Sequence, residues 1–310
     1  MNESQSGSFP NRTPSQWDHE TDVVVVGGGG TGLAAALEAA RNGARVLLLE
    51  KNEQLGGTTS IAVGSFTAAC TSMQKAAGIE DDPEWHNEDM GKFAAHREVK
   101  NNWDLRGFFA RHAAETFEWL TELGLEFHGP SPEPPNRVPR MHNVVPNAKA
   151  YVAFLHRRIL ELGAEIWLNC PAVRLFRSDE GFVVGLEVER GGKKLTIRAR
   201  KGIVLAAGDY SNGYEVKKGY LPNEVALVEG INPLATGDGH RLGEGVGAEL
   251  LNMDLVYGPE IRFIAPPRPP FAQLLPANPV VAKILGKGMN FLPKSILTRM
   301  VKRLLVTWQH

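Results

Sequence analysis

The 310-residue sequence predicts an α/β fold that combines a parallel sheet with an inserted antiparallel β-meander. Three observations support this prediction. Near the N-terminus, two short apolar runs flank a glycine-rich turn and an Ala/Leu-rich segment. Three β-like runs joined by turns follow after residue 170, and a further apolar run comes after residue 200. Apolar runs separated by a helical segment are typical of parallel strands, whereas closely spaced runs joined by turns are typical of antiparallel ones.

The N-terminal stretch is predicted to form one β-α-β unit. Asp22–Val26 has the composition of a buried parallel strand, Gly30–Asn42 that of a helix ended by Gly43, and Arg45–Leu49 that of a second buried strand. The helix supplies the crossover that two parallel strands require.

Three further helices are predicted before the meander. Two lie around Trp85–Glu98 and Trp103–Leu123, and Gly124 suits the C-terminal cap of the second. The third runs from about Ala148 to Leu162 and leads into a predicted strand at Glu165–Leu168. These helices place a largely α-helical segment between the first two strands and the meander.

The stretch His128–Asn147 contains many prolines, so we expect a long loop rather than regular structure. Its basic members are Arg137, Arg140 and His142. Long loops in compact domains are often functional, which makes these three residues candidates for a site; a solvated basic loop is the alternative.

The meander is predicted from three β-like runs, Val173–Arg177, Phe182–Glu189 and Leu195–Ala199. A separate, wholly apolar strand is expected at Ile203–Ala206. Beyond it, Thr236–Gly247 is punctuated by glycines and is expected to form a turn followed by a helix.

Composition excludes several classes of protein. A formal net charge of −1 gives no basic field for nucleic acid. Cys70 and Cys170 lack metal-ligand spacing, so we expect neither a disulfide framework nor a metal site. The first 20 residues are polar, without the apolar region of a signal peptide, and no apolar run approaches membrane-spanning length. We therefore expect a flexible leader over residues 1–20 and a cytoplasmic location.

The composition changes after Glu260, because no acidic residue appears from there to His310. This change predicts a domain boundary near Tyr257, with one domain over 21–256 and the start of a second over 257–310. Near the end, Ile296, Leu297, Met300, Val301, Leu304 and Leu305 recur at helical spacing opposite Arg299, Lys302 and Arg303. Packing within the second domain is the favoured interpretation of this basic amphipathic pattern, and peripheral membrane contact is the alternative.

The glycine-rich turn carries the first chemical signal. Gly27, Gly29 and Gly32 fit G-x-G-x-x-G between a predicted strand and a predicted helix, which is the context in which that motif binds a dinucleotide. The N-terminus of the helix attracts the pyrophosphate, and Glu50, after the second strand, is placed to accept hydrogen bonds from the adenosine ribose. These features indicate a Rossmann-like dinucleotide-binding domain.

The next residues indicate which dinucleotide binds. The ordered set GGGGTG, LLLEK, GGTTSIAVG, the meander, IVLAAG and ATGDG resembles the FAD-dependent family that includes fumarate reductase and succinate dehydrogenase flavoproteins and 3-ketosteroid dehydrogenases. The resemblance runs from about Asp22 to Met253. It implies an FAD-binding domain over 21–256 and an incomplete capping or substrate domain over 257–310. A nicotinamide-dependent Rossmann dehydrogenase is the alternative, for which Gly27 to Glu50 would suffice.

The resemblance also implies a set of cofactor-binding residues. It places Thr31 and Glu50 at the ADP half of FAD and Val173 near the adenine. The full set expected to bind FAD is Gly27, Gly29, Thr31, Gly32, Glu50, Lys51, Gly57, Thr58, Thr59, Ser60, Gly64, Val173, Ala207, Gly208 and Asp238.

Members of this family move a hydride between flavin N5 and a carbon next to an activating carbonyl, and a protein group handles the companion proton. The resemblance implies an enone, a steroid or a dicarboxylate as substrate, with an electron partner that the sequence does not identify. The catalytic group is unassigned. The weak candidates for it are Arg137, Arg140, His142 and Arg262. Arg262 and Arg268 are also expected to belong to the start of the capping domain. Because family members extend well beyond this length, we expect the N-terminal part of a longer enzyme or a shortened paralogue with impaired catalysis. A non-catalytic flavin-binding fragment is the remaining alternative.

Overall fold

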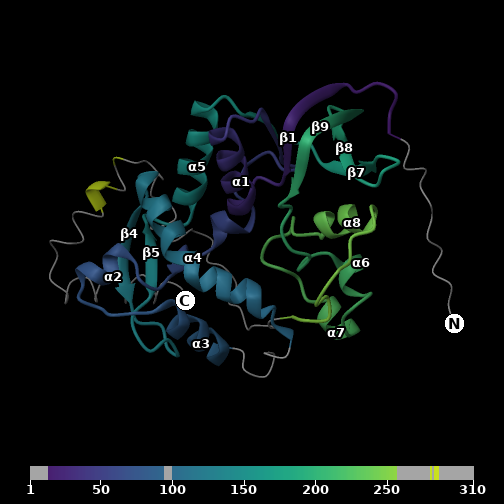
Figure 1. The fold of residues 1–310 in the computed structure, drawn as a ribbon. Helices are drawn as coiled ribbons and strands as arrows, with labels where there is room; N and C mark the ends of the chain where they lie inside the picture. Colours follow the sequence, from purple (N-terminus) through teal and green to yellow (C-terminus); the bar gives the residue numbers. More distant parts are fainter. Residues whose placement is uncertain (1–12, 94–99, 257–279, 281–282, 286–310) are drawn as a thin grey trace, which may run out of the picture. The chain divides into compact units, whose positions relative to one another are not determined.

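The computed structural model describes residues 13–93, 100–256, 280 and 283–285 (Figure 1). The chain divides into two compact units, one formed by Met1–Thr58 with Leu155–Pro259 and the other by Thr59–Phe154 with Glu260–His310. The predicted boundary near Tyr257 lies at the edge of the described residues and stays a prediction. Arg262, Arg268 and the amphipathic segment 296–305 lie outside the described residues.

A six-stranded sheet forms the centre of the first unit, in the order β6-β2-β1-β9-β8-β7. β6, β2, β1 and β9 run parallel to one another, whereas β8 runs antiparallel to both β9 and β7. The predicted α/β fold with an antiparallel meander is therefore confirmed, and the meander extends the parallel sheet itself. The strands are β1 (His19–Val26), β2 (Val46–Leu49), β6 (Glu165–Trp167), β7 (Ala172–Arg177), β8 (Val183–Arg190) and β9 (Lys193–Leu205).

The core of this unit lies where apolar residues of the sheet meet its helices. Val24, Leu47, Leu186 and Ile197 are fully buried in one cluster, which Leu242 joins from α8. The predicted first helix is confirmed as α1, which connects β1 to β2. The helices are α1 (Gly30–Arg41), α6 (Tyr214–Lys217), α7 (Asn223–Ala226) and α8 (Asp238–Glu244).

One predicted strand boundary is wrong. The run Leu195–Ala199 and the first three residues of the run Ile203–Ala206, expected as separate strands, belong to the single strand β9, which ends at Leu205. The polar residues between them misled the prediction, since Arg200 is exposed and pairs with Glu20 of β1 at 2.6 Å. The register between β1 and β9 shifts at this point, which accommodates the interruption without ending the strand.

The folded part of the chain begins before residue 21. The ring of Trp17 packs edge-on against Phe176 with centroids 5.7 Å apart, and Asp18 accepts hydrogen bonds of 2.8 Å from the backbone N–H and hydroxyl of Thr196. β1 then starts at His19. Of the predicted leader, residues 1–12 lie outside the described part of the chain.

The second unit contains a three-stranded antiparallel sheet in the order β3-β5-β4, together with helices. Phe117 is fully buried and packs against Phe127 and His142, with ring centroids 4.8 and 4.5 Å apart. The chain enters this unit through the 3₁₀ helix η1 (Gly57–Ile61) and leaves it through α5 (Lys149–Glu161). Its other elements are β3 (Ser65–Thr67), α2 (Ser72–Ala76), α3 (Pro83–Phe93), α4 (Trp103–Glu122), β4 (Glu126–Ser131) and β5 (Met141–Val145).

The prediction of one long loop over His128–Asn147 is wrong, because this stretch contains the greater part of β4 and all of β5. The prolines occupy positions that the two strands tolerate. Pro130 lies within the register break between His128 and Ser131, and Pro146 follows the last residue of β5. Among the described residues, no helix is long and apolar enough to cross a membrane.

Candidate cofactor-binding site

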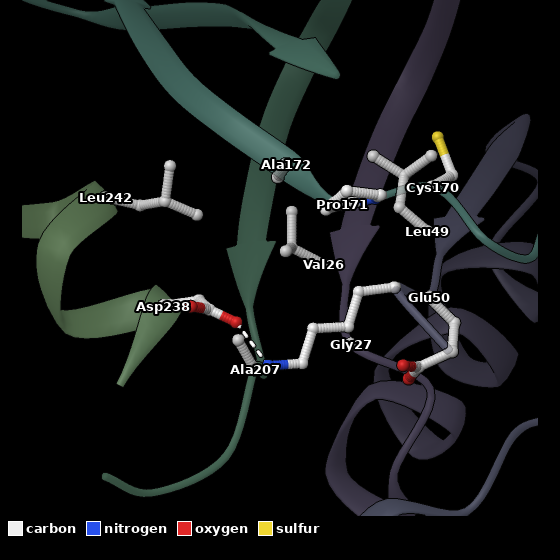
Figure 2. A pocket seen from close by; sticks show the side chains of 11 residues that line it. Val26, Gly27, Leu49, Glu50, Cys170, Pro171, Ala172, Ala207, Asp238 and Leu242 are labelled. Atoms are coloured by element: carbon white, nitrogen blue, oxygen red, sulfur yellow. Dashed lines mark hydrogen bonds and ion pairs between the residues drawn. The ribbon is translucent and has the colours of Figure 1, made fainter. Parts of the chain in front are cut away.

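A pocket lies at the carboxyl ends of the parallel strands of the first unit. β1 has β2 on one side and β9 on the other, so the strand order reverses beside β1, and open α/β sheets bind ligands at such a point. Figure 2 shows the pocket and its side chains. Five of its lining residues were predicted to bind the cofactor: Gly27, Glu50, Lys51, Ala207 and Asp238.

The turn after β1 requires glycine at two positions for different reasons. Gly27 has φ +108°, and a Cβ atom there would lie 2.3 Å from the carbonyl oxygen of Ala206. A Cβ atom on Gly32, in the first turn of α1, would lie 1.8 Å from the carbonyl oxygen of Gly27. The glycines therefore provide the tight turn and the close helix packing that the motif predicts.

The N-terminus of α1 suits an anion. Its N-cap residue is Gly29, which offers no side-chain cap, and its first turn contains no acidic residue. The positive end of the helix dipole is therefore not neutralised by a side chain of its own helix. A Cβ atom on Gly29 would meet only the carbonyl oxygen of Gly56, at 3.9 Å, and Thr31 is exposed in the first turn. Both residues fit the predicted approach of a diphosphate.

The second glycine pair packs against the first turn. The Gly56 N–H donates to the Gly28 carbonyl at 2.8 Å, and Gly29 forms a β-bridge with Gly56. Gly57 has φ +47°, and the exposed hydroxyl of Thr58 accepts a hydrogen bond of 3.1 Å from Asn232. The remaining predicted residues of this segment, Thr59, Ser60 and Gly64, belong to the second unit, and their contact with the cofactor stays a prediction.

Glu50 is held in place by two backbone amides. Glu50 is only 9% exposed. Its Oε2 atom accepts a hydrogen bond of 2.7 Å from the Gly28 N–H, and its Oε1 atom accepts one of 2.9 Å from the Asn52 N–H. Each carboxylate oxygen has a second lone pair for a further donor. The carboxylate is thus fixed beside the glycine turn and is able to accept hydrogen bonds from a ribose.

Lys51 joins the end of β2 to the start of α8. Its Nζ lies 2.6 Å from Asp238 Oδ2 and 2.8 Å from Thr236 Oγ1. Arg241 forms a second ion pair with Asp238. Burial by itself would raise the pKa of Asp238, but the hydrogen bond and charge of Lys51, together with the Thr236 hydroxyl and the charge of Arg241, hold this pKa below its usual value.

The matching family model is an FAD binding domain that covers residues 22–259. The chain belongs to this FAD-binding family. The family supports FAD as the cofactor, and the alternative of a nicotinamide dehydrogenase explains neither the second glycine pair nor the Asp238 segment. The geometry fits the assignment, since α1 begins beside the glycine turn without a side-chain cap or an acidic residue, and Glu50 is fixed next to the same turn.

Relatives of this FAD-binding chain include named reductases. It is 31% identical over 239 residues to a probable fumarate reductase of Shewanella frigidimarina, covering 76% of this chain and 40% of the relative. It is also 31% identical over 265 residues to a digoxin reductase of Eggerthella lenta, covering 76% of this chain and 46% of the relative. The chain thus spans less than half the length of these curated relatives.

Solved structures with the same fold include enzymes of two kinds. The open conformation of a flavocytochrome c3 fumarate reductase matches with a TM-score of 0.72 and 31% identity, over 78% of this chain and 43% of that one. A 3-ketosteroid-Δ4-(5α)-dehydrogenase of Rhodococcus jostii, in complex with 4-androstene-3,17-dione, matches with a TM-score of 0.70 and 27% identity, over 78% of this chain and 57% of that one. The resemblance stated from the motifs is therefore confirmed.

The sequence analysis missed the apolar wall of the pocket. Val173, predicted near the adenine, is 40% exposed and does not line the pocket, whereas Ala172, its neighbour, does. Adjacent residues of a strand face opposite sides, so Val173 and Ala172 point in different directions, and contact of Val173 with the adenine stays a prediction. Gly208 has φ +83° but is also absent from the lining residues. The apolar members that were missed are Val26, Leu49, Cys170, Pro171, Ala172 and Leu242.

Two of these missed residues lie in the connection between β6 and β7. The Cys170 N–H donates to the Glu50 carbonyl at 2.9 Å, which holds this connection against the end of β2. Burial raises the pKa of the Cys170 thiol to about 11, so the thiol is neutral and contributes to the apolar wall. The only sequence signal for this wall is the position of Pro171 just before the meander.

The three described catalytic candidates belong to the second unit. Arg140 is fully buried, with Nη2 2.6 Å from Asp81 Oδ1 and Nη1 2.6 Å from Asp89 Oδ2. Arg137 also binds Asp89, through its backbone N–H at 3.0 Å and its Nε at 3.0 Å. The structure therefore brings Arg137 and Arg140 together on one carboxylate. The alternative of a solvated basic loop is wrong for Arg140, because its side chain is fully buried between two buried carboxylates.

His142 is placed apart from this cluster. It is fully buried, its Nε2 lies 3.0 Å from Thr71 Oγ1, and its Nδ1 lies 3.2 Å from the Phe66 carbonyl. Burial lowers the pKa of His142, which keeps the ring neutral at pH 7. These contacts stabilise the second unit, and a part for Arg137, Arg140 or His142 in catalysis stays a prediction, as it does for Arg262 outside the described residues.

Proposed function

We propose that this chain is the FAD-binding part of an oxidoreductase that acts on a carbon–carbon bond next to a carbonyl group. The observation that carries the proposal is the pocket at the ends of β1 and β2, where the glycine turn, Glu50 and the Lys51–Asp238 pair converge in a member of an FAD-binding family. The names of the relatives, a fumarate reductase and a digoxin reductase, support this class of reaction.

The chain's own residues bind and orient the cofactor in this proposal. The turn from Gly27 to Gly32 and the N-terminus of α1 hold the diphosphate, and Glu50 accepts hydrogen bonds from the adenosine ribose. The wall formed by Pro171, Ala172 and their apolar neighbours receives a flat apolar ring. When bound, FAD supplies the hydride transfer.

We infer an enone, a steroid or a dicarboxylate as the substrate, since the names of the similar enzymes and structures cover all three. A group that handles the companion proton is needed as well. A non-catalytic flavin-binding role is the second candidate, because the catalytic candidates Arg140 and His142 are both fully buried within the second unit.

Reconstitution of the 310-residue protein with FAD tests the proposal. We expect a yellow protein that retains one equivalent of flavin through gel filtration, with no displacement by NAD⁺ or NADP⁺. Reoxidation of the reduced protein by fumarate or by a steroid enone would identify the substrate class. Retention of flavin without reoxidation by either compound favours the non-catalytic role, and loss of flavin from the folded protein contradicts the proposal.

A further inference from the structure

Lys51 is the one cation among the residues that line the pocket, all of which lie in the described part of the chain. Two carboxylates, those of Glu50 and Asp238, line the same pocket. The FAD diphosphate adds about two further negative charges. A pocket that presents two carboxylates to a dianion needs compensation, because like charges close together repel strongly in a poorly solvated site.

The two carboxylates are compensated in different ways. Glu50 accepts from two backbone amides, at 2.7 and 2.9 Å, which do not neutralise its charge but stabilise it locally. Asp238 instead makes ion pairs with Lys51 and Arg241. The side chain of Arg241 is 53% exposed, whereas those of Lys51 and Asp238 are 26% and 23% exposed. Solvent therefore screens the Arg241 pair more than it screens the Lys51 pair.

Lys51 also fixes the geometry around Asp238. Its Nζ donates to Asp238 Oδ2 at 2.6 Å and to Thr236 Oγ1 at 2.8 Å, and the Thr236 hydroxyl donates to Asp238 Oδ1 at 3.1 Å. The three side chains form a closed triangle, so the Asp238 carboxylate is held at both oxygens. Figure 2 marks the ion pair of Asp238 with a dashed line.

We propose that Lys51 is a positioning residue that acts through Asp238: it cancels the charge of this carboxylate and fixes it on the pocket wall, so that an anionic dinucleotide binds. This inference rests on the proposed function, because the dinucleotide is FAD. It differs from a direct contact between Lys51 and the diphosphate. If Lys51 contacted the diphosphate directly, its contribution to the affinity for FAD would not depend on the charge at position 238.

A double-mutant cycle distinguishes the two roles, with the FAD dissociation constant as the readout. We expect Lys51→Met to weaken FAD binding on the order of tenfold or more, and Lys51→Arg to restore most of the loss because it keeps the charge. In an Asp238→Asn background, where no carboxylate remains to compensate, we expect Lys51→Met to change the dissociation constant less than about twofold.

Lys194→Met is the matched control. Lys194 pairs with Glu187 at 3.2 Å, and Glu187, like Asp238, keeps a second partner, Arg174, at 2.8 Å. This variant also removes a lysine from a poorly exposed carboxylate, but away from the pocket, so FAD binding is expected to stay within twofold of the unmodified protein. Far-UV circular dichroism checks the fold of each variant, and Lys51→Gln replaces Lys51→Met if the latter does not fold.

Three outcomes overturn the inference. Equal losses from Lys51→Met in the two backgrounds would mean that Lys51 contacts FAD directly. Unchanged FAD binding in Lys51→Met would mean that Lys51 plays no part. When the unmodified protein binds FAD, each of these two results overturns only this inference and leaves the proposed function intact. If the unmodified, folded protein does not bind FAD, the proposed function fails and this inference fails with it.

Discussion

Gly32 lies so close to Gly27 that a Cβ atom on Gly32 would come within 1.8 Å of the Gly27 carbonyl oxygen. Both partners are backbone or backbone-attached atoms, so no flexible side chain can move aside. The first turn of α1 is therefore packed directly onto the turn that follows β1. This contact sets the position of the helix N-terminus beside the glycine turn.

Gly32→Ala is therefore expected to displace α1. Overpacking of this kind typically costs about 1–3 kcal/mol, and we expect a loss of at least that size in the free energy of unfolding together with loss of FAD binding. Gly202→Ala is the control, since a Cβ atom on Gly202 would meet nothing within 4 Å. Urea unfolding and flavin retention measure both variants, and equal stability of the two would contradict the prediction.

Glu50→Gln is expected to disrupt the pocket without changing its volume. Both carboxylate oxygens of Glu50 accept from backbone N–H groups, so the amide NH₂ of glutamine would face a donor at Gly28 or Asn52. An unsatisfied buried donor costs about 1–3 kcal/mol. We expect a fall of this size in stability and weaker FAD binding by isothermal titration. Glu53→Gln, at an exposed neighbouring position, should leave both quantities unchanged.

Arg140→Met is expected to destabilise the second unit strongly. It leaves the buried carboxylates of Asp81 and Asp89 without their shared partner, and removing one member of a buried ion pair costs about 3–5 kcal/mol. Arg111→Met, which removes an arginine that is exposed and 3.9 Å from Glu84, should cost less than about 0.5 kcal/mol. Chemical unfolding compares the two, and a small loss in Arg140→Met would show that the cluster relaxes.

His86 predicts a dependence of stability on pH. Burial, aided by the charge of Arg140 and opposed by Asp81 and Asp89, lowers the pKa of His86 to about 4 from 6.5. Between these values the unfolded chain binds a proton that the folded chain does not. The free energy of unfolding therefore falls as pH falls from 6.5 to about 4, by up to about 1.4 kcal/mol per pH unit.

His86→Phe should flatten this part of the stability profile. The slope contributed by His142, whose pKa is lowered in the same direction, remains. Phe109→Leu is the control, because it alters the ring whose centroid lies 6.0 Å from that of His86 without removing a titratable group. Urea unfolding at a series of pH values between 4 and 8 measures the slopes, and an unaltered slope in His86→Phe would rule out His86 as its source.

The parts of the fold that the sequence revealed are those specified by local patterns. Short local patterns predict the β-α-β unit, the meander and the glycine turn. These patterns are the apolar runs, the turn residues and the spacing of Gly27, Gly29 and Gly32. Glu50 was identifiable because it directly follows an apolar strand. These elements contribute Gly27, Glu50 and Lys51 to the lining of the pocket, so this part of the candidate site was predictable from the sequence.

The errors arose where distant contacts decide the structure. The prolines around β4 and β5 led to the prediction of a loop, because the local sequence does not show that β4 pairs with β5 across a register break. The burial of Arg140 depends on Asp81 and Asp89, which lie on a separate segment. The pocket wall from Cys170 to Ala172 is fixed by a backbone bond to Glu50, and no side-chain pattern encodes it.

The pairing of β1 with β9 also has a consequence for how the protein is made. Asp18 and Thr196, which meet at the start of this pair, are 178 positions apart. At ribosomal speeds of about 5–20 residues per second, β1 waits on the order of ten to thirty seconds for β9 to be synthesised. Throughout this interval one side of the nascent β1 lacks its neighbour, so early capture of the emerging apolar strand by a chaperone would protect the chain from premature association.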